Sequence, residues 1–256
     1  MGFTFGDNWR RFSQTLDEGR LTEAQTGLGR LVGLDQLRGR SFVDVGAGSG
    51  LFSIAAVRCG AAPVVAFDRD EECVSVAWQN ARRFLTPAQL GALQIRHGDI
   101  LEPRGLGDAT FDVVHAWGSL HHTGAMWQAI ANAAGLCRAG GHLVLAIYNR
   151  TPSSPFWLRA KRLYHAAPLP LELAMAGSLA AARSTARVLT GKHPVRTDRG
   201  MDVWHDAVDW LGGLPYECAS AAEVTDSLDR LGFSAVRENL TRRSGCNEFT
   251  FRKRCS

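Results

Sequence analysis

Three aspartates and one glycine-rich turn are the residues whose types and spacing could carry chemistry. The segment Asp44-Val45-Gly46-Ala47-Gly48-Ser49-Gly50 joins a short apolar run to a helix-like one. Its glycines would let the backbone turn sharply and approach a ligand closely. Leu51 stands where the dinucleotide fingerprint G-x-G-x-x-G needs its third glycine. Because Asp44 also places a carboxylate beside the turn, the segment argues against NAD or FAD and favours a ligand that carries positive charge.

Two further acids end the next two predicted strands. Asp68 follows Gly50 by 18 residues, where a ribose-binding acid is expected. Its two oxygens could accept hydrogen bonds from both ribose hydroxyls. Asp99, in His97-Gly98-Asp99-Ile100, could accept from the exocyclic amine of adenine. Since the carboxyl ends of neighbouring parallel strands meet at one edge, the three acids predict a site for a nucleoside with a cationic tail.

The elements that must position these acids alternate between strand and helix. Short apolar runs predict strands at 41–45 and 63–67, and further strands are predicted at 93–97, 111–117 and 142–148. Helices are predicted at 51–59, 71–84 and 123–138. This alternation indicates a parallel sheet with helices on both faces.

The two ends of the chain complete the predicted fold. Residues 1–40 are predicted to form two helices, the second starting at the capping box Thr22-Glu23-Ala24-Gln25. Near the other end, a helix at 220–231 with a capping box of Ser220 and Glu223 precedes strands at 234–238 and 248–252. Those two strands are expected to form an antiparallel hairpin at the sheet edge.

The glycine turn and the strand-end acids resemble those of the class I S-adenosylmethionine-dependent methyltransferases. The resemblance covers residues 41–150. Within this range, Phe111-Asp112-Val113-Val114 and Ser119-Leu120-His121-His122 also match the family. The Leu-His-His looks like that of the ubiquinone/menaquinone-type branch. Flanking segments, among them Phe5-Gly6-Asp7-Asn8-Trp9 and Asp209-Trp210-Leu211-Gly212-Gly213, resemble a recurrent bacterial subgroup. The implied fold is α/β: a seven-stranded Rossmann-like methyltransferase sheet, mostly parallel, with N-terminal helices and a helical lid insert between strands five and six.

The resemblance implies a cofactor site residue by residue. S-adenosyl-L-methionine is the expected cofactor and S-adenosyl-L-homocysteine the product. The methionine part would be held by Asp44, Gly46, Ala47, Gly48 and Gly50, the ribose by Asp68, and the adenine by Asp99 and Ile100. The remaining predicted cofactor residues are Arg69, Trp117 and Trp9. For the two tryptophans, packing in the core is the alternative.

Adjacent histidines follow the fourth strand, where the family keeps its acceptor. A neutral imidazole of His122 or His121 suits removal of a hydroxyl proton as the methyl group arrives. His205, next to Asp206, is the rival base. The alternative is that the histidines only shape the pocket and that alignment of acceptor, methyl carbon and sulfur supplies much of the rate.

Residues 151–218 interrupt the alternation and form the predicted lid. Positions 151–200 hold eight Lys and Arg against two acids, a local charge of +6. A helix is predicted over 171–190. The predicted substrate-binding residues are Tyr148, Asn149, Arg183, Arg187, Arg199 and Trp210. The arginines would select an acceptor with a carboxylate or phosphate; they could also merely face water, and a lipid-linked acceptor is a further alternative.

Composition bounds what the chain can be. With 256 residues, 45% of them hydrophobic, and a net charge of +4, it is a folded protein rather than a disordered one. No apolar run is long enough for a membrane span, and no signal peptide is recognisable. Six scattered cysteines without a C-x-x-C pair argue against zinc and disulfides and favour the cytoplasm. No other metal site is indicated either.

The sequence therefore predicts three parts: an N-terminal helical segment (1–40), a cofactor-binding domain (41–150 and 219–256) and the lid insert (151–218). The expected activity is methyl transfer to a small-molecule nucleophile in a biosynthetic pathway, most readily a hydroxyl or carboxylate oxygen. The alternatives are modification of tRNA or rRNA through the basic insert, N- or C-methylation, and a non-catalytic cofactor-binding protein. We expect no stable nucleic-acid partner, and a monomer or homodimer.

Overall fold

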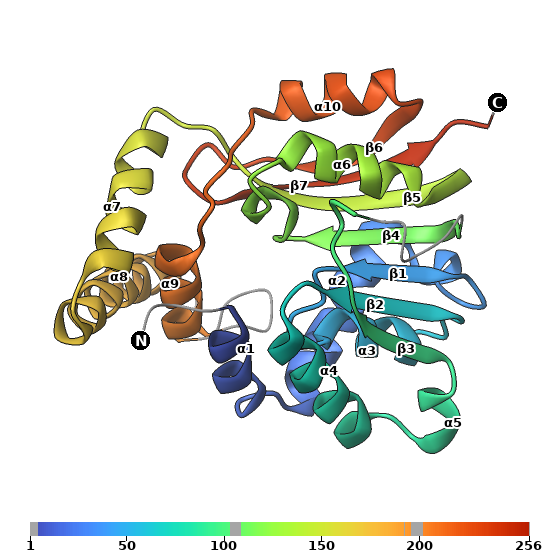
Figure 1. Cartoon of the computed structure of the whole chain (residues 1–256), viewed down its shortest axis with the longest axis horizontal. Helices are drawn as coiled ribbons and strands as arrows, with labels where there is room; N and C mark the ends of the chain where they lie inside the picture. The colour runs from blue at the N-terminus through green and yellow to red at the C-terminus, as the bar shows by residue number, and fades with distance from the viewer. Residues whose placement is uncertain (1–4, 103–108, 192, 196–201, 256) are drawn as a thin grey trace.

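The computed structural model describes residues 5–102, 109–191, 193–195 and 202–255 (Figure 1). Helices α1 (Phe5–Ser13) and α2 (Glu18–Val32) open this part of the chain. The predicted capping box at Thr22 is wrong. Helix α2 begins earlier because the Asp17 side chain accepts a hydrogen bond from the Arg20 N–H at 2.8 Å.

Seven strands form one sheet in the order β3-β2-β1-β4-β5-β7-β6. The strands are β1 (Phe42–Val45), β2 (Val64–Asp68), β3 (Leu93–His97), β4 (Phe111–Trp117), β5 (Cys137–Tyr148), β6 (Phe233–Asn239) and β7 (Cys246–Lys253). Strands β1 to β5 pair in parallel, whereas β7 is antiparallel to both β5 and β6. The predicted seven-stranded sheet with a C-terminal antiparallel hairpin is thereby confirmed.

Helices cover both faces of this sheet (Figure 1). One apolar cluster joins the sheet to α1, α2, α3 (Leu51–Arg58) and α4 (Glu71–Phe84), and a second joins it to α6 (Met126–Gly135) and α10 (Ala221–Arg230). A short α5 (Pro87–Leu90) precedes β3, and single 3₁₀ turns lie at η1 (Leu34–Gln36) and η3 (Leu120–His122). Every residue of β1 is buried, as expected for a parallel strand covered on both faces.

The predicted helix at 123–138 is too long at both ends. Helix α6 ends at Gly135 because β5 already begins at Cys137, whose register pairs it with Phe111 of β4. In contrast, the capping box of Ser220 and Glu223 is present at the start of α10.

Three helices leave the sheet between β5 and α10: α7 (Ser154–Ala166), α8 (Leu169–Leu189) and α9 (Val203–Gly212). Figure 1 shows them beside the carboxyl ends of the parallel strands, with α9 next to α1. A third apolar cluster, which includes Tyr148, Tyr164 and Trp210, joins them to the end of β5. The predicted helical insert is therefore present, while its role as a lid stays a prediction. No helix in the described part of the chain has the length and apolar content needed to cross a membrane.

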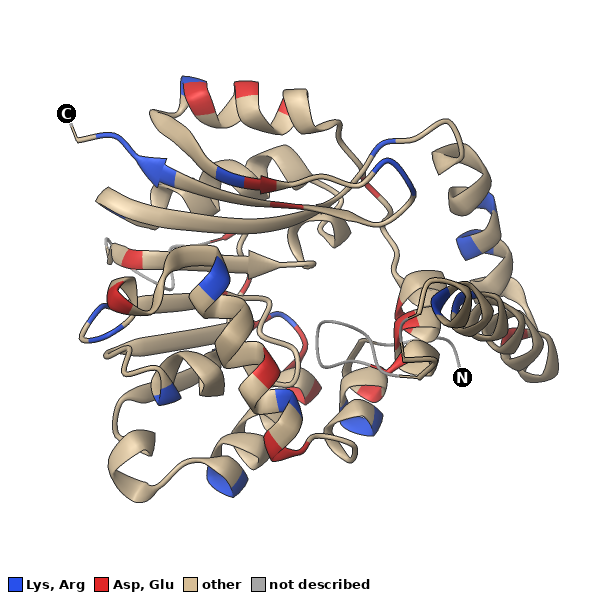
Figure 2. Cartoon of the chain, turned by 180° about the vertical axis from the view of Figure 1, so that it is seen from behind, with Lys and Arg blue, Asp and Glu red and all other residues tan. Residues whose placement is uncertain are grey.

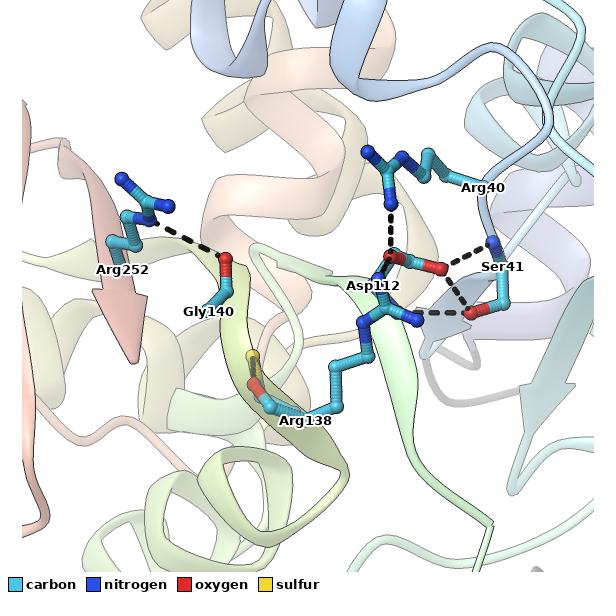
Figure 3. A network of polar contacts seen from close by, with 7 residues as sticks. Arg40, Ser41, Asp112, Arg138, Gly140 and Arg252 are labelled. Carbon is cyan, nitrogen blue, oxygen red and sulfur yellow. Dashed lines mark hydrogen bonds and ion pairs between the residues drawn. The ribbon is translucent and has the colours of Figure 1, made fainter. Parts of the chain in front are cut away.

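A polar network at the start of β4 ties three strands together at the edge opposite the glycine turn (Figure 3). The Asp112 carboxylate accepts hydrogen bonds from the Ser41 N–H at 2.9 Å and the Ser41 hydroxyl at 2.8 Å. It also pairs with Arg40 at 3.4 Å and with Arg138. Burial alone would raise the pKa of Asp112, but the Ser41 hydrogen bonds and the two arginines outweigh it and lower that pKa.

Asp112→Asn is expected to lower the free energy of unfolding by about 1–3 kcal/mol at neutral pH, because charge-assisted hydrogen bonds are lost. A carboxyl whose pKa is lower in the folded state stabilises the fold above its unfolded pKa, about 3.9, and stops doing so as the pH falls through the folded value. Urea unfolding should therefore show a difference that shrinks below about pH 4. Asp229→Asn, which breaks the exposed pair with Arg254, should cost about 0–1 kcal/mol. An Asp112→Asn effect no larger than this control would contradict the prediction.

Candidate functional site

A cavity of about 560 Å³ lies at the carboxyl ends of β1 to β4. Its lining includes the predicted cofactor residues Gly46, Asp68, Arg69, Asp99, Ile100, Trp117 and Trp9. The strand order β3-β2-β1-β4 brings the positions at the strand ends together, and helix α1 adds Trp9, although these residues are spread over more than a hundred residues of sequence. We refer to this cavity as the first cavity.

The glycine turn has a backbone that only glycine adopts easily. Gly46, Gly48 and Gly50 have φ values of 72°, 54° and 75°. A Cβ on Gly46 would lie 2.4 Å from the Ser119 Cβ, and one on Gly48 would lie 2.8 Å from the Trp9 ring. The turn therefore forms a tight cradle, with the Trp9 indole covering Gly48.

Asp68 connects the end of β2 to this turn. One carboxylate oxygen accepts from the Gly48 N–H at 2.9 Å and the other from the Asp70 N–H at 3.0 Å. Burial raises the pKa of Asp68, although the two N–H groups oppose the shift. Each oxygen keeps a second lone pair, so the side chain can still accept from a diol in the cavity.

Asp99 and Arg69 lie on the far side of the first cavity. The Arg69 Nε is 3.4 Å from an Asp99 oxygen, and the other Asp99 oxygen accepts from the Leu101 N–H at 2.9 Å. Ile100 is buried next to them. These three residues offer an apolar wall and a carboxylate edge, which suits a flat heteroaromatic ring with an exocyclic amine.

Asp44 points away from the first cavity. Its carboxylate accepts from the Ser53 hydroxyl at 2.6 Å and lies 2.8 Å from the His115 Nδ1. The pair is buried, and the His115 Nε2 has no hydrogen-bond partner among the described residues. The resemblance implies that Asp44 holds the methionine part of the cofactor. With its carboxylate turned toward Ser53 and His115, Asp44 would do so only indirectly.

A second cavity, of about 330 Å³, lies between the glycine turn and the helical insert. Predicted residues that line it are Asp44, Gly46, Ala47, His121, Trp117, Trp9, Tyr148, Arg183 and Trp210. Five residues line both cavities: Trp9, Gly46, Trp117, Gly118 and Asp209. A ligand in one cavity therefore lies next to a ligand in the other at these five positions.

The adjacent histidines face different cavities. His121 lines the second cavity, and its ring lies 3.7 Å from that of Tyr148. Neither of its ring nitrogens has a partner in the described structure, and burial lowers its pKa far below the usual range. His122 lines the first cavity. Its Nδ1 must donate to the Pro215 carbonyl at 2.9 Å, and burial lowers its pKa to about 3. Both imidazoles therefore stay neutral and accept protons poorly.

Several predicted site residues are not among the described residues that line the two cavities. The His205 Nδ1 is 2.6 Å from Asp202, the residue that caps α9. Asn149 donates to the Thr241 carbonyl at 2.7 Å, and Arg187 donates to the His193 carbonyl at 2.8 Å. Their geometry fits structural roles. Arg199 lies outside the described residues.

The charge of the insert is less available than its sequence suggested. The Arg183 guanidinium pairs with the Asp206 carboxylate and lies 5.5 Å from the Trp210 ring. Lys161 is fully buried, and its Nζ donates to the Trp210 carbonyl. Burial lowers the pKa of Lys161 to about 8. Figure 2 shows Lys and Arg positions along α7 and acidic positions near α9, where the insert meets the rest of the molecule.

Asp209 is the functional candidate that sequence reasoning missed. It stands in a segment singled out by resemblance, but only its neighbour Trp210 received a role. One signal was available: Asp202, Asp206 and Asp209 recur at helical spacing, which places three carboxylates on one side of α9. Among the described residues, no three His, Cys, Asp or Glu side chains are placed to hold one metal ion.

Comparison with known proteins identifies the domain that these cavities belong to. Residues 43–145 match the family model described as a methyltransferase domain. The chain is 33% identical over 148 residues to 27-O-demethylrifamycin SV methyltransferase of Amycolatopsis mediterranei, covering 57% of this chain and 51% of that protein. It is 41% identical over 63 residues to ribosomal protein L11 methyltransferase of Xanthomonas euvesicatoria, covering 25% and 21%. The chain thus spans about half or less of these curated relatives.

A solved structure extends the likeness to the whole fold. Magnesium protoporphyrin IX methyltransferase from Synechocystis PCC 6803, with bound S-adenosylhomocysteine, aligns with a TM-score of 0.60 at 19% identity, over 96% of this chain and 93% of that one. Residues 43–145 therefore match a methyltransferase domain, and the chain shares the fold of a methyltransferase with bound S-adenosylhomocysteine. Placement in the ubiquinone/menaquinone-type branch stays a prediction.

Proposed function

We propose that this protein transfers the methyl group of S-adenosylmethionine, held in the first cavity, to an oxygen nucleophile of a small molecule held in the second. The observation that supports this most directly is the shared wall. Trp9, Gly46, Trp117, Gly118 and Asp209 line both cavities, so donor and acceptor can meet without leaving the protein. Placing two reactants in register removes much of the entropic barrier to a methyl transfer.

The residues of the first cavity fit the cofactor. Asp68 would accept hydrogen bonds from the ribose, Asp99 would accept from the adenine amine, and Ile100 would pack on the ring. Gly46 lines this cavity and packs against the Ser119 side chain, so an added Cβ would displace the turn that the cofactor approaches. When bound, the cofactor supplies an electrophilic methyl group on a positively charged sulfur. An excess of carboxylates around the cavity suits that charge.

The second cavity favours an uncharged acceptor that contains a ring. Tyr148, Trp117 and Trp210 offer aromatic surface, on which planar groups stack. Its charged residues are Arg183 and the acids Asp44, Asp206 and Asp209. Because Arg183 already pairs with Asp206, an anionic acceptor would have to break that pair in an acidic setting. We therefore propose a neutral hydroxylated acceptor rather than a carboxylate or phosphate.

Two measurements test the proposed function. Calorimetry should detect binding of S-adenosylmethionine and of S-adenosylhomocysteine at one site per chain. A panel of hydroxylated aromatic compounds should then include acceptors that drive S-adenosylhomocysteine formation together with a gain of one methyl group, detected by mass spectrometry. Failure to bind either cofactor form would refute the proposal. Turnover only with RNA in place of the small molecules would instead support the nucleic-acid alternative.

A further inference from the structure

Asp209 occupies a position that no other acid of the described structure shares. It is the one carboxylate that lines both cavities, whereas Asp68 and Asp99 line only the first and Asp44 and Asp206 only the second. If the proposed function holds, the methyl group crosses from one cavity to the other. A group at their common boundary must then lie next to the sulfur, the methyl carbon and the acceptor atom.

Helices α1 and α9 hold this carboxylate in place. Asp209 lies on α9, and one of its oxygens, Oδ1, accepts from the Asn8 side chain of α1 at 3.3 Å. The second oxygen accepts no hydrogen bond within the described part of the chain, so its lone pairs are available to a bound molecule. Trp9, next to Asn8, also lines both cavities, so α1 and α9 close over the same point.

The charged and titratable groups around Asp209 come from four helices and one strand. Asp206 lies one turn earlier on α9, Lys161 on α7, Arg183 on α8 and Cys73 on α4; Tyr148 ends β5. Burial and Asp206 raise the pKa of Asp209 to about 6, against the opposing effects of Lys161, Asn8 and Arg183. A carboxyl of that kind can exchange a proton near neutral pH, whereas the imidazoles of His121 and His122 cannot.

We propose that Asp209 is the catalytic base, which takes the acceptor's hydroxyl proton during methyl transfer. In this step the acceptor oxygen bonds to the methyl carbon, the carbon–sulfur bond breaks with its electron pair going to sulfur, and the hydroxyl proton passes to the free oxygen of Asp209. The inference rests on the proposed function. Electrostatics explain why Asp209 can take up the proton at this step. Before the step, the positive sulfur keeps the Asp209 carboxylate ionised. After it, that charge is gone and the carboxyl holds a proton more readily.

The first test needs no acceptor. S-adenosylmethionine carries the sulfonium charge and S-adenosylhomocysteine does not, so the ratio of their affinities reports groups close to the sulfur. A positive sulfur lowers the pKa of Asp209, and a pKa lowered on binding makes binding stronger as pH rises. Calorimetry between about pH 5 and pH 7 should show the ratio rising about tenfold, which corresponds to one pKa unit. The rise should disappear in Asp209→Asn and persist in Glu172→Gln, which removes a carboxylate of α8 that lines neither cavity.

The second test separates proton transfer from binding. Turnover is measured as S-adenosylhomocysteine formation with phenol, which is un-ionised at about pH 8, and with 4-nitrophenol, which is largely ionised there. Asp209→Asn should lose roughly 10²–10⁴-fold with phenol and much less with 4-nitrophenol, because an ionised acceptor needs no base. Equal losses with both phenols, or a wild-type affinity ratio that stays flat with pH, would overturn the assignment while leaving the proposed function intact. A wild-type protein that binds neither cofactor form would instead remove the proposed function itself.

Discussion

Asp68→Ala is expected to weaken S-adenosylmethionine binding by about 10²–10⁴-fold. The carboxylate lines the first cavity and keeps a free lone pair on each oxygen, since each accepts only one backbone N–H in the structure. Two charge-assisted hydrogen bonds to a ribose contribute about 1.5–3 kcal/mol each, and each 1.4 kcal/mol corresponds to tenfold in affinity. Calorimetry with the two cofactor forms measures the loss, which should be similar for both because both carry the same ribose.

The matched control is Asp35→Ala, which removes an exposed carboxylate of η1 away from both cavities. It should leave cofactor affinity unchanged. A pH series adds an independent check. Because burial raises the pKa of Asp68, protonation begins at a higher pH than for an exposed aspartate, and affinity should fall as the solution is acidified. If Asp68→Ala remained folded and bound the cofactor as tightly as Asp35→Ala, Asp68 would not be the ribose ligand.

Sequence patterns located the sheet well because its elements satisfy local and global preferences together. The predicted helix at 71–84 coincides with α4, which Asp70 caps through the Glu72 N–H at 2.9 Å. The strands at 93–97 and 111–117 coincide with β3 and β4. Strand β4 is a valine-rich and mostly buried run, whereas β3 alternates the buried Leu93 and Ile95 with less buried polar residues. The error at α2 arose where two acceptable caps compete, and Asp17 extends the helix by an additional turn.

The side chains that point into each cavity were harder to predict than the location of the cavities. Strand-end positions follow from the alternation of strands and helices, so Asp68 and Asp99 could be found from spacing alone. The direction of a side chain could not be found from spacing. Asp44 turns toward His115, a pairing that depends on the register between β1 and β4. The adjacent His121 and His122 diverge into different cavities because successive residues of a 3₁₀ turn point in different directions.

The insert shows most clearly why composition does not determine a site. Its +6 charge suggested an anion-binding lid, and the sequence alone gave no means of seeing which cations would be paired or buried. In the structure, Lys161 lies among the rings of Tyr148, Trp210 and Tyr216, and Arg183 pairs with Asp206. Such pairings join residues of different helices, and they depend on how α7, α8 and α9 pack.

Gly46→Ala is expected to weaken S-adenosylmethionine binding by about 100-fold, equivalent to roughly 3 kcal/mol, and to lower stability. The residue lines both cavities with a φ of 72°, a conformation that costs a residue with a Cβ about 1–2 kcal/mol. The new Cβ would also lie 2.4 Å from that of Ser119, whose hydroxyl donates to the Val45 carbonyl at 2.7 Å. Because both sides are fixed, the turn itself must shift, and the cradle for the cofactor shifts with it.

Two further variants separate the steric contribution from the backbone one. Gly232 has a φ of 86°, and no atom lies within 4 Å of a Cβ added there. The Gly232→Ala variant should therefore lose only about 1–2 kcal/mol of stability and keep full cofactor affinity. The double variant Gly46→Ala/Ser119→Gly removes the clash and should recover part of the affinity, a coupling that urea unfolding and calorimetry can both measure. Gly46→Ala behaving like Gly232→Ala in both measurements would show that the close approach to Ser119 does not shape the cofactor site. Recovery in the double variant would establish that the cradle depends on the absence of a side chain at residue 46 as much as on its backbone angle.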